Sequence, residues 1–589
     1  MTASGTTSLS KTRLQVMWNR LLAVVEEQGQ ALIRAAFSPI VRECGDISAG
    51  IFDLQGRMMA QAVTGTPGHI NTMAEAVKTL RNRFPLQEMQ PGDIYLTNDP
   101  WIASGHLNDF LLLMPVFLEG RVIGFTSCTS HLVDLGGQGM GPEGSDIYDE
   151  GLLIPPCKLL DRGDVNQLLL DIVKANSREP IANEGDIYAL IACCETGASR
   201  LLEMMREFGI DDLDDLSNYI IDTSRRGTIA AISEIPPGTW NYTLPVDGYE
   251  KEIELVASLS VEADRMLLDF TGTSSCSAKG INVPINYATA YSVFALRCII
   301  GPDIPNNAGS LEPFVVQAPK GCILNAQPPA PVAMRHTLGQ MTPDLVYGCL
   351  RQALPDKVPA EGASCMYDLP MRSAPEVARG GGDGDGDGDG NGSAAAAAEV
   401  FALEPAHNGG TGARPTKDGL SATAFPSGVW GSQVEITEAS VPVMIKSRQL
   451  RPDSGGAGTY RGGLGQRIEL QSANNQPFLV FLSVERIKNP ARGSNGGQAG
   501  APGRIRLTSG GSGGGEDGEG GGGEERDLPG KGEIRVEPGQ TMIFETPGGG
   551  GYGPPNQRSR QAVALDIAED LVSHDAAQRH YDWNPDETD

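Results

Sequence analysis

The chain of 589 residues lacks the features that define several large protein classes. None of its ten cysteines forms a Cys-x-x-Cys pair, which argues against a thiolate zinc site or a redox dithiol. Scattered thiols suit a reducing compartment better than a disulfide framework. No basic stretch followed by a long apolar core opens the sequence, and the longest apolar run, residues 110–118, is far too short to cross a bilayer. We therefore expect a soluble cytoplasmic protein without a membrane partner.

An excess of positive charge is also missing. The 46 Lys and Arg residues stand against 74 Asp and Glu residues, so the formal net charge is −28 at pH 7. A field of that sign repels nucleic acid, and we expect no nucleic-acid partner. Part of the acidity lies in two low-complexity inserts, residues 380–398 and 509–525, whose composition cannot bury much apolar surface. We predict that both inserts are disordered.

Motifs for nucleotide binding and serine hydrolysis are missing as well. The segment Thr546–Gly553 is glycine-rich, but no Gly-Lys-Ser/Thr follows it. We find neither a strand-to-helix Gly-x-Gly-x-x-Gly nor a Gly-x-Ser-x-Gly elbow between a strand and a helix. A tight structural loop is the favoured interpretation of the glycine-rich segment, and a phosphate cradle is the alternative. The chain is therefore predicted to lack a nucleotide-binding site of its own.

The most informative stretch of the chain is a predicted β-hairpin. Two apolar, β-rich runs flank the dipeptide Glu119-Gly120, and such a pattern is typical of a hairpin with a tight turn. If the turn is centred on this dipeptide, opposed residues have numbers that sum to about 239. Asp109 then lies across from Ser130 or His131. The open end of the hairpin is therefore polar on both strands.

Metal-ligating side chains gather at this open end. Two of the seven histidines, His106 and His131, open the same tetrapeptide, His-Leu-x-Asp. His106 lies in the loop that leads into the first strand and Asp109 begins that strand, so two imidazoles and a carboxylate converge. This donor set indicates a metal site, with a hydrogen-bonded polar turn as the alternative. Asp46, at the start of another predicted strand, could be a fourth ligand, although a strand cap is the favoured reading of that residue alone. His69 lies in a predicted loop before a helix and could line a substrate pocket, cap the helix or pack.

Composition and periodicity predict an α+β fold, with a large mixed α/β metal-binding amino-terminal region and a strand-rich carboxyl-terminal region. The expected elements include a helix over 11–36, a helix over 71–84 and a strand over 434–436. The predicted divisions are the metal-site region 1–230, a second mixed α/β region 231–379, the insert 380–398, a strand-rich and glycine-rich region 399–555 that contains the insert 509–525, and a helical tail 556–589.

Several motifs occur together in one order along the chain. They are Ser38-Pro-Ile-x-x-Glu43-x-x-Asp46-x-Ser48, Asn98-Asp99-Pro100, Gly105-His106-Leu-x-Asp109, His131-x-x-Asp134-x-Gly-Gly, Glu150-Gly151, the glycine-rich residues 455–463 and Thr546–Gly553. With these motifs, residues 10–580 resemble the hydantoinase B / 5-oxoprolinase family. That family includes the B subunit of ATP-dependent N-methylhydantoinase, the caprolactamase B subunit, the carboxyl-terminal half of 5-oxoprolinase and the α subunit of acetone carboxylase. The two inserts, Trp101 and Ser104 depart from the usual pattern and leave the substrate open.

The resemblance implies a single divalent metal, Zn, Mn or Fe, held by Asp46, His106, Asp109 and His131. It also implies a hetero-oligomer with a hydantoinase A-type ATPase subunit, which would bind the ATP and phosphorylate the oxygen of a small cyclic-amide substrate. This chain would then open the activated ring of a hydantoin, 5-oxoproline or a related lactam. The alternatives are the α subunit of an ATP-dependent acetone- or acetophenone-type carboxylase and a non-catalytic assembly subunit.

Carboxylates near the proposed metal are the candidates for proton transfer and support. Glu43 and Glu150 are candidate general bases, and an ordinary surface carboxylate is the alternative for each. Asp134 or Asp99 could orient the ligand histidines from behind.

Overall fold

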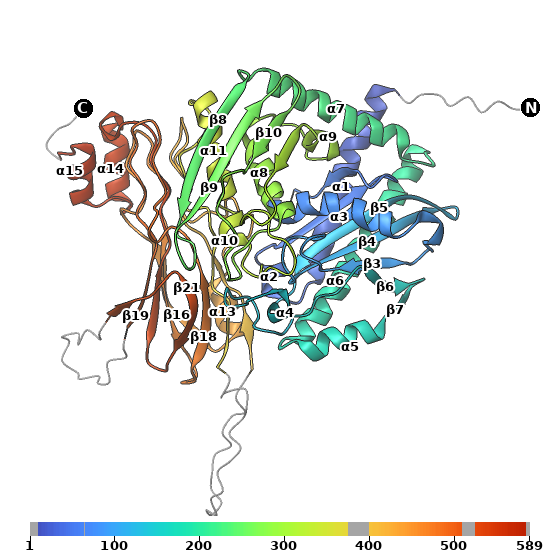
Figure 1. Cartoon of the computed structure of the whole chain (residues 1–589), viewed down its shortest axis with the longest axis horizontal. Coiled ribbons are helices and arrows are strands. Elements are labelled where there is room, and N and C mark those ends of the chain that lie inside the picture. Colours follow the sequence, from blue (N-terminus) through green and yellow to red (C-terminus); the bar gives the residue numbers. More distant parts are fainter. Residues whose placement is uncertain (1–9, 64, 375–399, 509–524, 585–589) are drawn as a thin grey trace, which may run out of the picture.

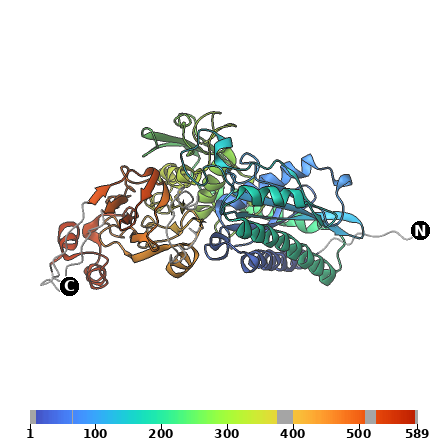
Figure 2. The ribbon, with the colours of Figure 1, turned by 90° about the horizontal axis from the view of Figure 1, so that it is seen from below.

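The computed structural model describes residues 10–63, 65–374, 400–508 and 525–584. The predicted inserts 380–398 and 509–525 lie outside the described residues, except for Glu525. The predicted α+β class is confirmed, because helices and several separate sheets alternate along the chain (Figure 1). The amino-terminal region lies at one end of the molecule, the carboxyl-terminal region at the other and the second region between them (Figure 2). Across the described ranges, no helix has the length and apolarity to span a membrane.

The amino-terminal region is one sheet buried on both faces. Its strand order is β2-β1-β5-β4-β3-β6-β7. The strands are β1 Ile47–Phe52, β2 Met58–Gln61, β3 Ile94–Thr97, β4 Asp109–Leu118, β5 Arg121–His131, β6 Cys157–Asp161 and β7 Asp164–Val165. Helices α1 (Lys11–Ala35) and α6 (Pro180–Phe208) pack on one face, and α3 (Pro67–Arg83) packs on the other. Burial on both faces explains why β4 is a nearly unbroken apolar run rather than an alternating one.

The central hairpin has the predicted turn, and its register places two candidate ligands opposite each other. Glu119 and Gly120 have φ angles of 50° and 81°, the pair of positive values that a tight two-residue hairpin turn needs. A bulge between Val116 and Phe117 shifts the pairing by one residue, and Asp109 therefore pairs with His131 rather than with Ser130. The predicted register is confirmed at its open end.

The second region is a mixed, mainly antiparallel sheet with helices packed against it. Its strand order is β11-β10-β9-β8, of which β10 and β11 run parallel. The strands are β8 Gly238–Val246, β9 Ile253–Val261, β10 Met266–Asp269 and β11 Phe314–Gln317. Helices α8 (Ile285–Ile299) and α11 (Thr342–Ala353) share a hydrophobic core with this sheet. The burial of alternate residues in β9 is typical of a sheet with one covered face.

The carboxyl-terminal region holds two larger sheets, and a two-stranded sheet of β12 (Tyr367–Asp368) and β15 (Ala406–His407) lies where this region begins. The strand orders of the larger sheets are β14-β13-β18-β21 and β16-β17-β22-β19-β20. The strands are β13 Met371–Ser373, β14 Ala402–Leu403, β16 Val443–Leu450, β17 Gln466–Ser472, β18 Phe478–Ser483, β19 Arg504–Thr508, β20 Glu525–Asp527, β21 Lys531–Val536 and β22 Thr541–Glu545. Because β13 pairs with β18, residues 371–373 join a sheet of the strand-rich region, although they precede its predicted start at 399. Helices α14 (Arg560–Ala568) and α15 (His574–Tyr581) form the predicted helical tail.

The predicted strand over 434–436 is wrong, because these residues begin helix α13 (Val434–Ser440). The alternation Val-Glu-Ile suggested a strand, but a short apolar pattern cannot distinguish a strand from a helix. Glu435 lies in the first turn of α13, where its negative charge interacts favourably with the helix dipole.

The glycine-rich segments of this region pack backbone against backbone. A Cβ atom on Gly548 would lie 1.8 Å from the Ser454 carbonyl oxygen, and one on Gly549 would lie 2.0 Å from that of Thr411. The segments are joined by backbone hydrogen bonds, such as Gly549 N to Gly463 O at 2.9 Å. Glycine is required here because no side chain fits between these closely packed backbone segments. The geometry therefore favours the structural interpretation of Thr546–Gly553.

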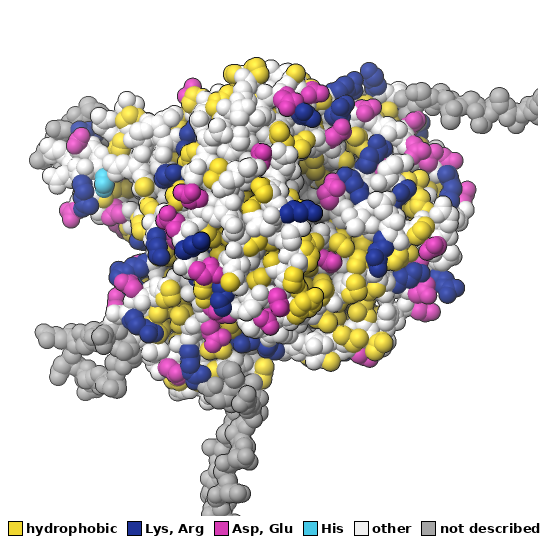
Figure 3. Space-filling model, in the orientation of Figure 1, with side chains coloured by type: hydrophobic (Ala, Val, Ile, Leu, Met, Phe, Trp, Pro, Cys, Tyr) yellow, Lys and Arg dark blue, Asp and Glu magenta, His cyan; other side chains and the backbone are white. Residues whose placement is uncertain are grey.

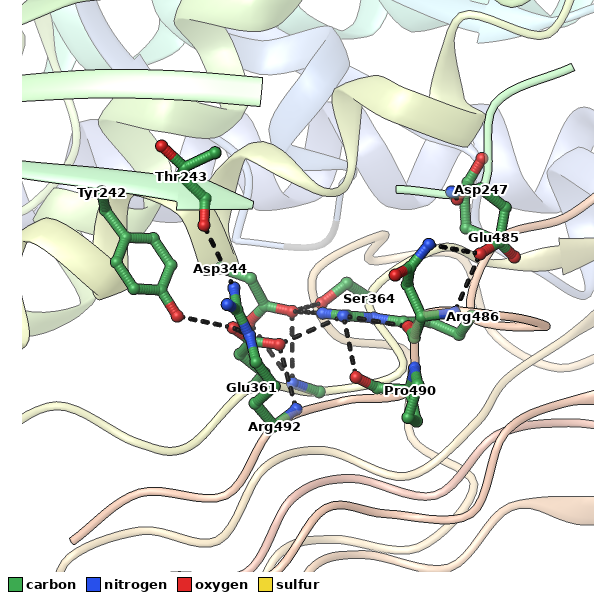
Figure 4. Close-up of polar contacts among 12 residues, drawn as sticks. Tyr242, Thr243, Asp247, Asp344, Glu361, Ser364, Glu485, Arg486, Pro490 and Arg492 are labelled. Atoms are coloured by element: carbon green, nitrogen blue, oxygen red, sulfur yellow. Dashed lines mark hydrogen bonds and ion pairs between the residues drawn. The ribbon is translucent and has the colours of Figure 1, made fainter. Parts of the chain in front are cut away.

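A loop over residues 485–492 fastens the carboxyl-terminal region to the second region (Figure 4). Arg486 is 1% exposed, and its guanidinium donates to Asp344 Oδ2 at 2.6 Å and to Glu361 Oε2 at 3.1 Å. Glu361 also accepts from Arg492 Nε and from the Tyr242 hydroxyl, each at 2.8 Å. These five residues, called the Arg486 cluster below, hold the two regions in one arrangement.

The surface carries charges of both signs. On the face shown in Figure 3, the described Lys and Arg side chains lie scattered among Asp and Glu side chains, without a continuous basic band. A nucleic-acid backbone needs a clustered basic surface, and this face does not offer one.

Candidate metal centre

The candidate ligands come from strand ends that meet at one edge of the amino-terminal sheet. Asp46 directly precedes β1, Asp109 begins β4 and His131 ends β5. Because β1, β5 and β4 are neighbours in the sheet, these ends lie side by side. His106 is in the loop before β4, and the neighbouring Asn108 carbonyl accepts a hydrogen bond from Leu132 N at 2.8 Å. The hairpin therefore places its own ligands.

Three of the predicted ligands form one compact group. Ligand atoms of His106, Asp109 and His131 all lie within 4.8 Å of one another, and all three residues are buried. His106 Nε2 lies 2.9 Å from Asp109 Oδ1, and the two imidazole centroids are 5.0 Å apart. Asp46 lines the same cavity but does not belong to this group.

The facing atoms of His106 and Asp109 have no hydrogen between them. His106 Nδ1 lies 3.1 Å from the carbonyl oxygen of Ala333, so in the neutral ring Nδ1 carries the hydrogen and Nε2 presents a lone pair. That lone pair faces Asp109 Oδ1, another acceptor, and neither atom has a hydrogen-bond partner; the same is true of both nitrogens of His131. Buried acceptors without donors are costly. A cation with imidazole and carboxylate ligands would satisfy them.

The electrostatics keep the two imidazoles neutral and Asp109 ionised. Burial and, next, the Arg335 guanidinium lower the pKa of His106, and burial together with His106 holds the pKa of His131 well below its ordinary value. Burial raises the pKa of Asp109, but His106, His69 and Arg335 lower it by more. The net result is a pKa well below the ordinary value. Neutral imidazole and ionised carboxylate are the forms that bind metals.

His69 lines the cavity, which is one of the three roles that the sequence left open for it. Its Nδ1 lies 3.4 Å from Asp46 Oδ1 and its Nε2 lies 3.2 Å from Asp109 Oδ2. Burial lowers the pKa of His69, but the carboxylates of Asp109 and Asp46 together raise it above the ordinary value. The predicted loop before residue 71 is wrong, because α3 begins at Pro67, in agreement with the preference for proline in the first turn of a helix.

The rest of the cavity comes from the other two regions. Arg335 donates to Asp109 Oδ2 at 2.7 Å and stacks over the Tyr287 ring at 4.2 Å. Glu404 Oε2 lies 3.4 Å from His131 Nε2, and burial followed by Asp368 holds the pKa of Glu404 well above its ordinary value. The enclosed space measures about 20 Å³, and the value rises to about 380 Å³ when the open mouth is included. No local pattern in the sequence singles out Arg335, Asp368 or Glu404.

The structure places the predicted catalytic and supporting carboxylates outside this cavity. Glu43 pairs with Arg42 at 2.8 Å, and Asp99 accepts from Trp101 N at 3.0 Å. Asp134 does not reach a ligand histidine, because it pairs with Arg178 at 2.6 Å. The sequence pattern could not reveal this partner, which lies 44 residues away.

Glu150 lies outside the cavity and accepts hydrogen bonds from backbone that contacts a candidate ligand. Its Oε1 accepts from Val332 N at 2.6 Å and from Ala333 N at 2.8 Å, and the Ala333 carbonyl is the group that faces His106. Burial raises the pKa of Glu150 to about 8. The geometry therefore gives Glu150 a supporting position rather than the predicted position of a general base.

Comparisons with known proteins agree with this architecture. The family model for hydantoinase B/oxoprolinase matches residues 10–555. Caprolactamase subunit beta of Pseudomonas jessenii is 28% identical, with 96% of this chain and 95% of that protein covered. The crystal structure of ATP-dependent caprolactamase from the same organism superposes with a TM-score of 0.85 at 26% identity, over 99% of this chain and 98% of that chain.

A second solved structure shares the fold. Nucleotide-free acetone carboxylase superposes with a TM-score of 0.82 at 20% identity, over 97% of this chain and 79% of that chain. At that identity the similarity concerns the fold alone. The family model covers nearly the whole described chain, and this protein belongs to the hydantoinase B/oxoprolinase family.

Proposed function

We propose that this chain is the metal-bearing B subunit of an ATP-dependent cyclic-amide hydrolase. The observation that carries the proposal is the pair of facing acceptors, His106 Nε2 and Asp109 Oδ1, 2.9 Å apart and buried beside His131. The relative named caprolactamase subunit beta supports the substrate class and the need for a partner. Hydantoin, 5-oxoproline and related lactams are the candidate substrates.

The residues present fit a divalent metal. We propose that His106, Asp109, His131 and Asp46 hold one ion of Zn, Mn or Fe, since mixed imidazole and carboxylate donors suit all three. Such an ion, when bound, lowers the pKa of a coordinated water from roughly 15.7 towards about 7 and so makes a nucleophile available at neutral pH.

The chain's own residues prepare the site for that ion. The Ala333 carbonyl fixes the hydrogen of His106 on Nδ1, which leaves Nε2 free to bind. Arg335 holds the second oxygen of Asp109 at 2.7 Å, so that carboxylate keeps one orientation. Glu150 fixes the backbone that carries the Ala333 carbonyl. Each contact limits rotation of a ligand and therefore reduces the reorganisation needed on binding.

A partner subunit would supply the activation. An unstrained amide is a poor electrophile, and phosphorylation of its oxygen creates an imidate-like carbon that water attacks more readily. Expulsion of the ring nitrogen from the resulting tetrahedral carbon breaks the C–N bond and leaves an acyl phosphate, which water hydrolyses to the carboxylate and inorganic phosphate. This chain shows no nucleotide-binding motif. We therefore propose that a hydantoinase A-type ATPase subunit binds the ATP and phosphorylates the amide, and that the two chains form a hetero-oligomer.

Co-expression with the partner subunit tests the proposal. The complex should open a hydantoin, 5-oxoproline or a lactam only when ATP is present, and complexes with His106→Ala or Asp109→Ala should be inactive while still assembled. A wild-type complex that turns over none of these rings would reject the function.

The shared fold with acetone carboxylase gives a second candidate, a carboxylase α subunit. ATP turnover that depends on bicarbonate and a ketone would favour that reading. Fully active complexes of metal-free protein would instead indicate a non-catalytic assembly subunit.

A further inference from the structure

A second depression adjoins the metal cavity and shares two of its walls. Its enclosed space measures about 20 Å³, or about 270 Å³ with the open mouth included, and Met140 and Glu404 line both spaces. Its remaining walls come from the amino-terminal and carboxyl-terminal regions, with Arg178 on one side and Arg372, on β13, on the other. The depression therefore lies directly outside the cavity, at the junction of two regions.

The two guanidinium groups of this depression differ in how their charges are balanced. Arg178 Nη1 lies 2.6 Å from Asp134 Oδ1, and the backbone N of Arg178 donates to the second oxygen of Asp134 at 2.5 Å. Arg372 has no such partner: within the described ranges, no carboxylate lies at ion-pair distance from it. Its contacts are a 3.4 Å hydrogen bond to the Gln138 carbonyl and stacking on the Phe481 ring at 4.9 Å.

Arg372 therefore lacks a directly paired carboxylate. Burial and, next, Arg178 lower its pKa, although Glu533 and Asp134 lie near enough to oppose that shift. The Phe481 ring contacts the guanidinium, and Arg178 is a second cation that lines the depression. A fixed, planar fork of N–H donors is the preferred receptor for phosphate oxygens, which it can bind in a bidentate manner. Glu404 lies at the wall shared with the metal cavity, and its carboxyl group separates the two spaces.

We propose that this depression binds the phosphoryl group of the activated substrate, with Arg372 as its principal ligand and Arg178 as its second. The inference rests on the proposed function, because only a phosphorylated amide would bring a tetrahedral oxyanion next to the metal cavity. The adjoining walls would let the ring occupy the inner space while its phosphoryl group occupies the outer one. Arg372 thereby selects the phosphorylated form of the substrate over the unreacted amide.

Binding of inorganic phosphate and methyl phosphate to the full-length chain tests this site without turnover. Titrations by calorimetry use protein stripped with a chelator, so that phosphate bound to a metal ion makes no contribution. Arg372→Met keeps the length of the side chain and its contact with Phe481 but removes the charge, and it should weaken both ligands about tenfold or more. Arg372→Lys should fall between wild type and Arg372→Met. Arg526→Met, on the exposed strand β20, is the matched control and should bind like wild type.

Kinetics of the assembled complex separate this inference from the proposed function. Inorganic phosphate should inhibit ring opening by the wild-type complex, and the inhibition constant should rise about tenfold in Arg372→Met. Phosphate affinity equal in wild type and Arg372→Met, or no binding to the wild-type chain, would overturn the anion site even if the complex opens rings. Binding that depends on Arg372 in a complex without ring-opening activity would reject the function but support the oxyanion site.

Discussion

Two buried groups of charged side chains differ in how completely their polar atoms are matched. In the Arg486 cluster, Asp344 Oδ2 accepts from the Ser364 hydroxyl at 2.5 Å and from Arg486 at 2.6 Å, and both oxygens of Glu361 accept hydrogen bonds. In the metal cavity, His106 Nε2, Asp109 Oδ1 and both nitrogens of His131 have none. Burial is similar in the two places, so exposure does not cause the difference.

The difference indicates that the Arg486 cluster stabilises the fold and that the metal cavity is arranged to bind a ligand. Folding alone completes the hydrogen bonds of the carboxylates in the Arg486 cluster, and the cluster joins two regions. Folding of the cavity brings two acceptors, His106 Nε2 and Asp109 Oδ1, together without a donor between them, an arrangement that persists only when packing enforces it or a ligand completes it. Removing a charge should therefore harm stability at the first place and metal binding at the second.

Arg486→Met should have the largest effect on stability. The substitution leaves Asp344 and Glu361 buried without their main cation, and breaking a buried ion pair in this way costs about 3–5 kcal/mol. Urea unfolding followed by circular dichroism measures the change. Arg492→Met is the control, because its side chain is 41% exposed and should cost far less. Equal losses in the two variants would contradict the structural role of Arg486.

Glu150 has one oxygen with hydrogen bonds, as in the Arg486 cluster, and one oxygen without, as in the metal cavity. Its Oε1 accepts two backbone hydrogen bonds, while its Oε2 has no partner. Burial raises its pKa from 4.5 to about 8. Between these pH values the folded chain keeps a proton that the unfolded chain has lost, so the free energy of unfolding should fall as the pH rises, by up to about 5 kcal/mol. Above pH 8 this contribution should level off.

Glu150→Gln should remove that pH dependence, because the amide stays neutral at every pH and can still accept from Val332 and Ala333. The variant should match wild type near pH 4.5 and exceed it in stability near pH 8. Urea titrations from pH 4.5 to 9 measure both curves, with Glu75→Gln on the surface of α3 as the control. Parallel curves for wild type and Glu150→Gln would contradict the buried, protonated carboxyl.

The part of the site that the sequence predicts correctly is the part that local rules determine. Two apolar runs and the Glu119-Gly120 turn are sufficient to bring Asp109 and His131 together, because a two-residue turn determines the register of its strands. The bulge that selects His131 over Ser130 has no sequence signal of its own. The motifs around Asp46, Asp99, Asp109 and His131 lie at strand ends of this sheet, whereas the glycine-rich motifs 455–463 and Thr546–Gly553 belong to the carboxyl-terminal region.

The missing part of the site depends on contacts between distant segments. His69 reaches the cavity because α3 begins at Pro67 and packs closely on α8, where a Cβ atom on Gly68 would lie 2.7 Å from the Tyr287 ring. Glu404 comes from the carboxyl-terminal region, and no periodicity relates it to His131. Asp134 was predicted behind a histidine because of its spacing, but Arg178 pairs with it instead. Long-range packing decides all three positions.

His131→Asn should separate metal binding from folding. Neither nitrogen of His131 has a hydrogen-bond partner, so the metal-free variant should unfold at nearly the wild-type urea concentration. Metal affinity should fall about 100-fold or more, because a binding free energy of roughly 10–16 kcal/mol is shared among about four ligands. Wild type should gain about 2.7 kcal/mol of stability at a free metal concentration 100 times its Kd, and the variant should gain almost none at that concentration. Metal titration monitored by thermal unfolding measures both effects, and equal gains would contradict the ligand role.

Ser364→Ala should have the smallest effect and sharpens the contrast within the Arg486 cluster. The hydroxyl of Ser364 donates to Asp344 Oδ2, which retains Arg486 and the backbone N of Gly362 as donors. Loss of one hydrogen bond to a charged group costs about 1.5–3 kcal/mol, and the remaining donors place the expected loss at about 1.5 kcal/mol, the lower end of that range. Combined with Arg486→Met in a double-mutant cycle, the two losses should not add, because both variants act on the same carboxylate. Strict additivity would mean that Asp344 does not connect the two donors, and the cluster would then be a set of separate contacts rather than one clamp between regions.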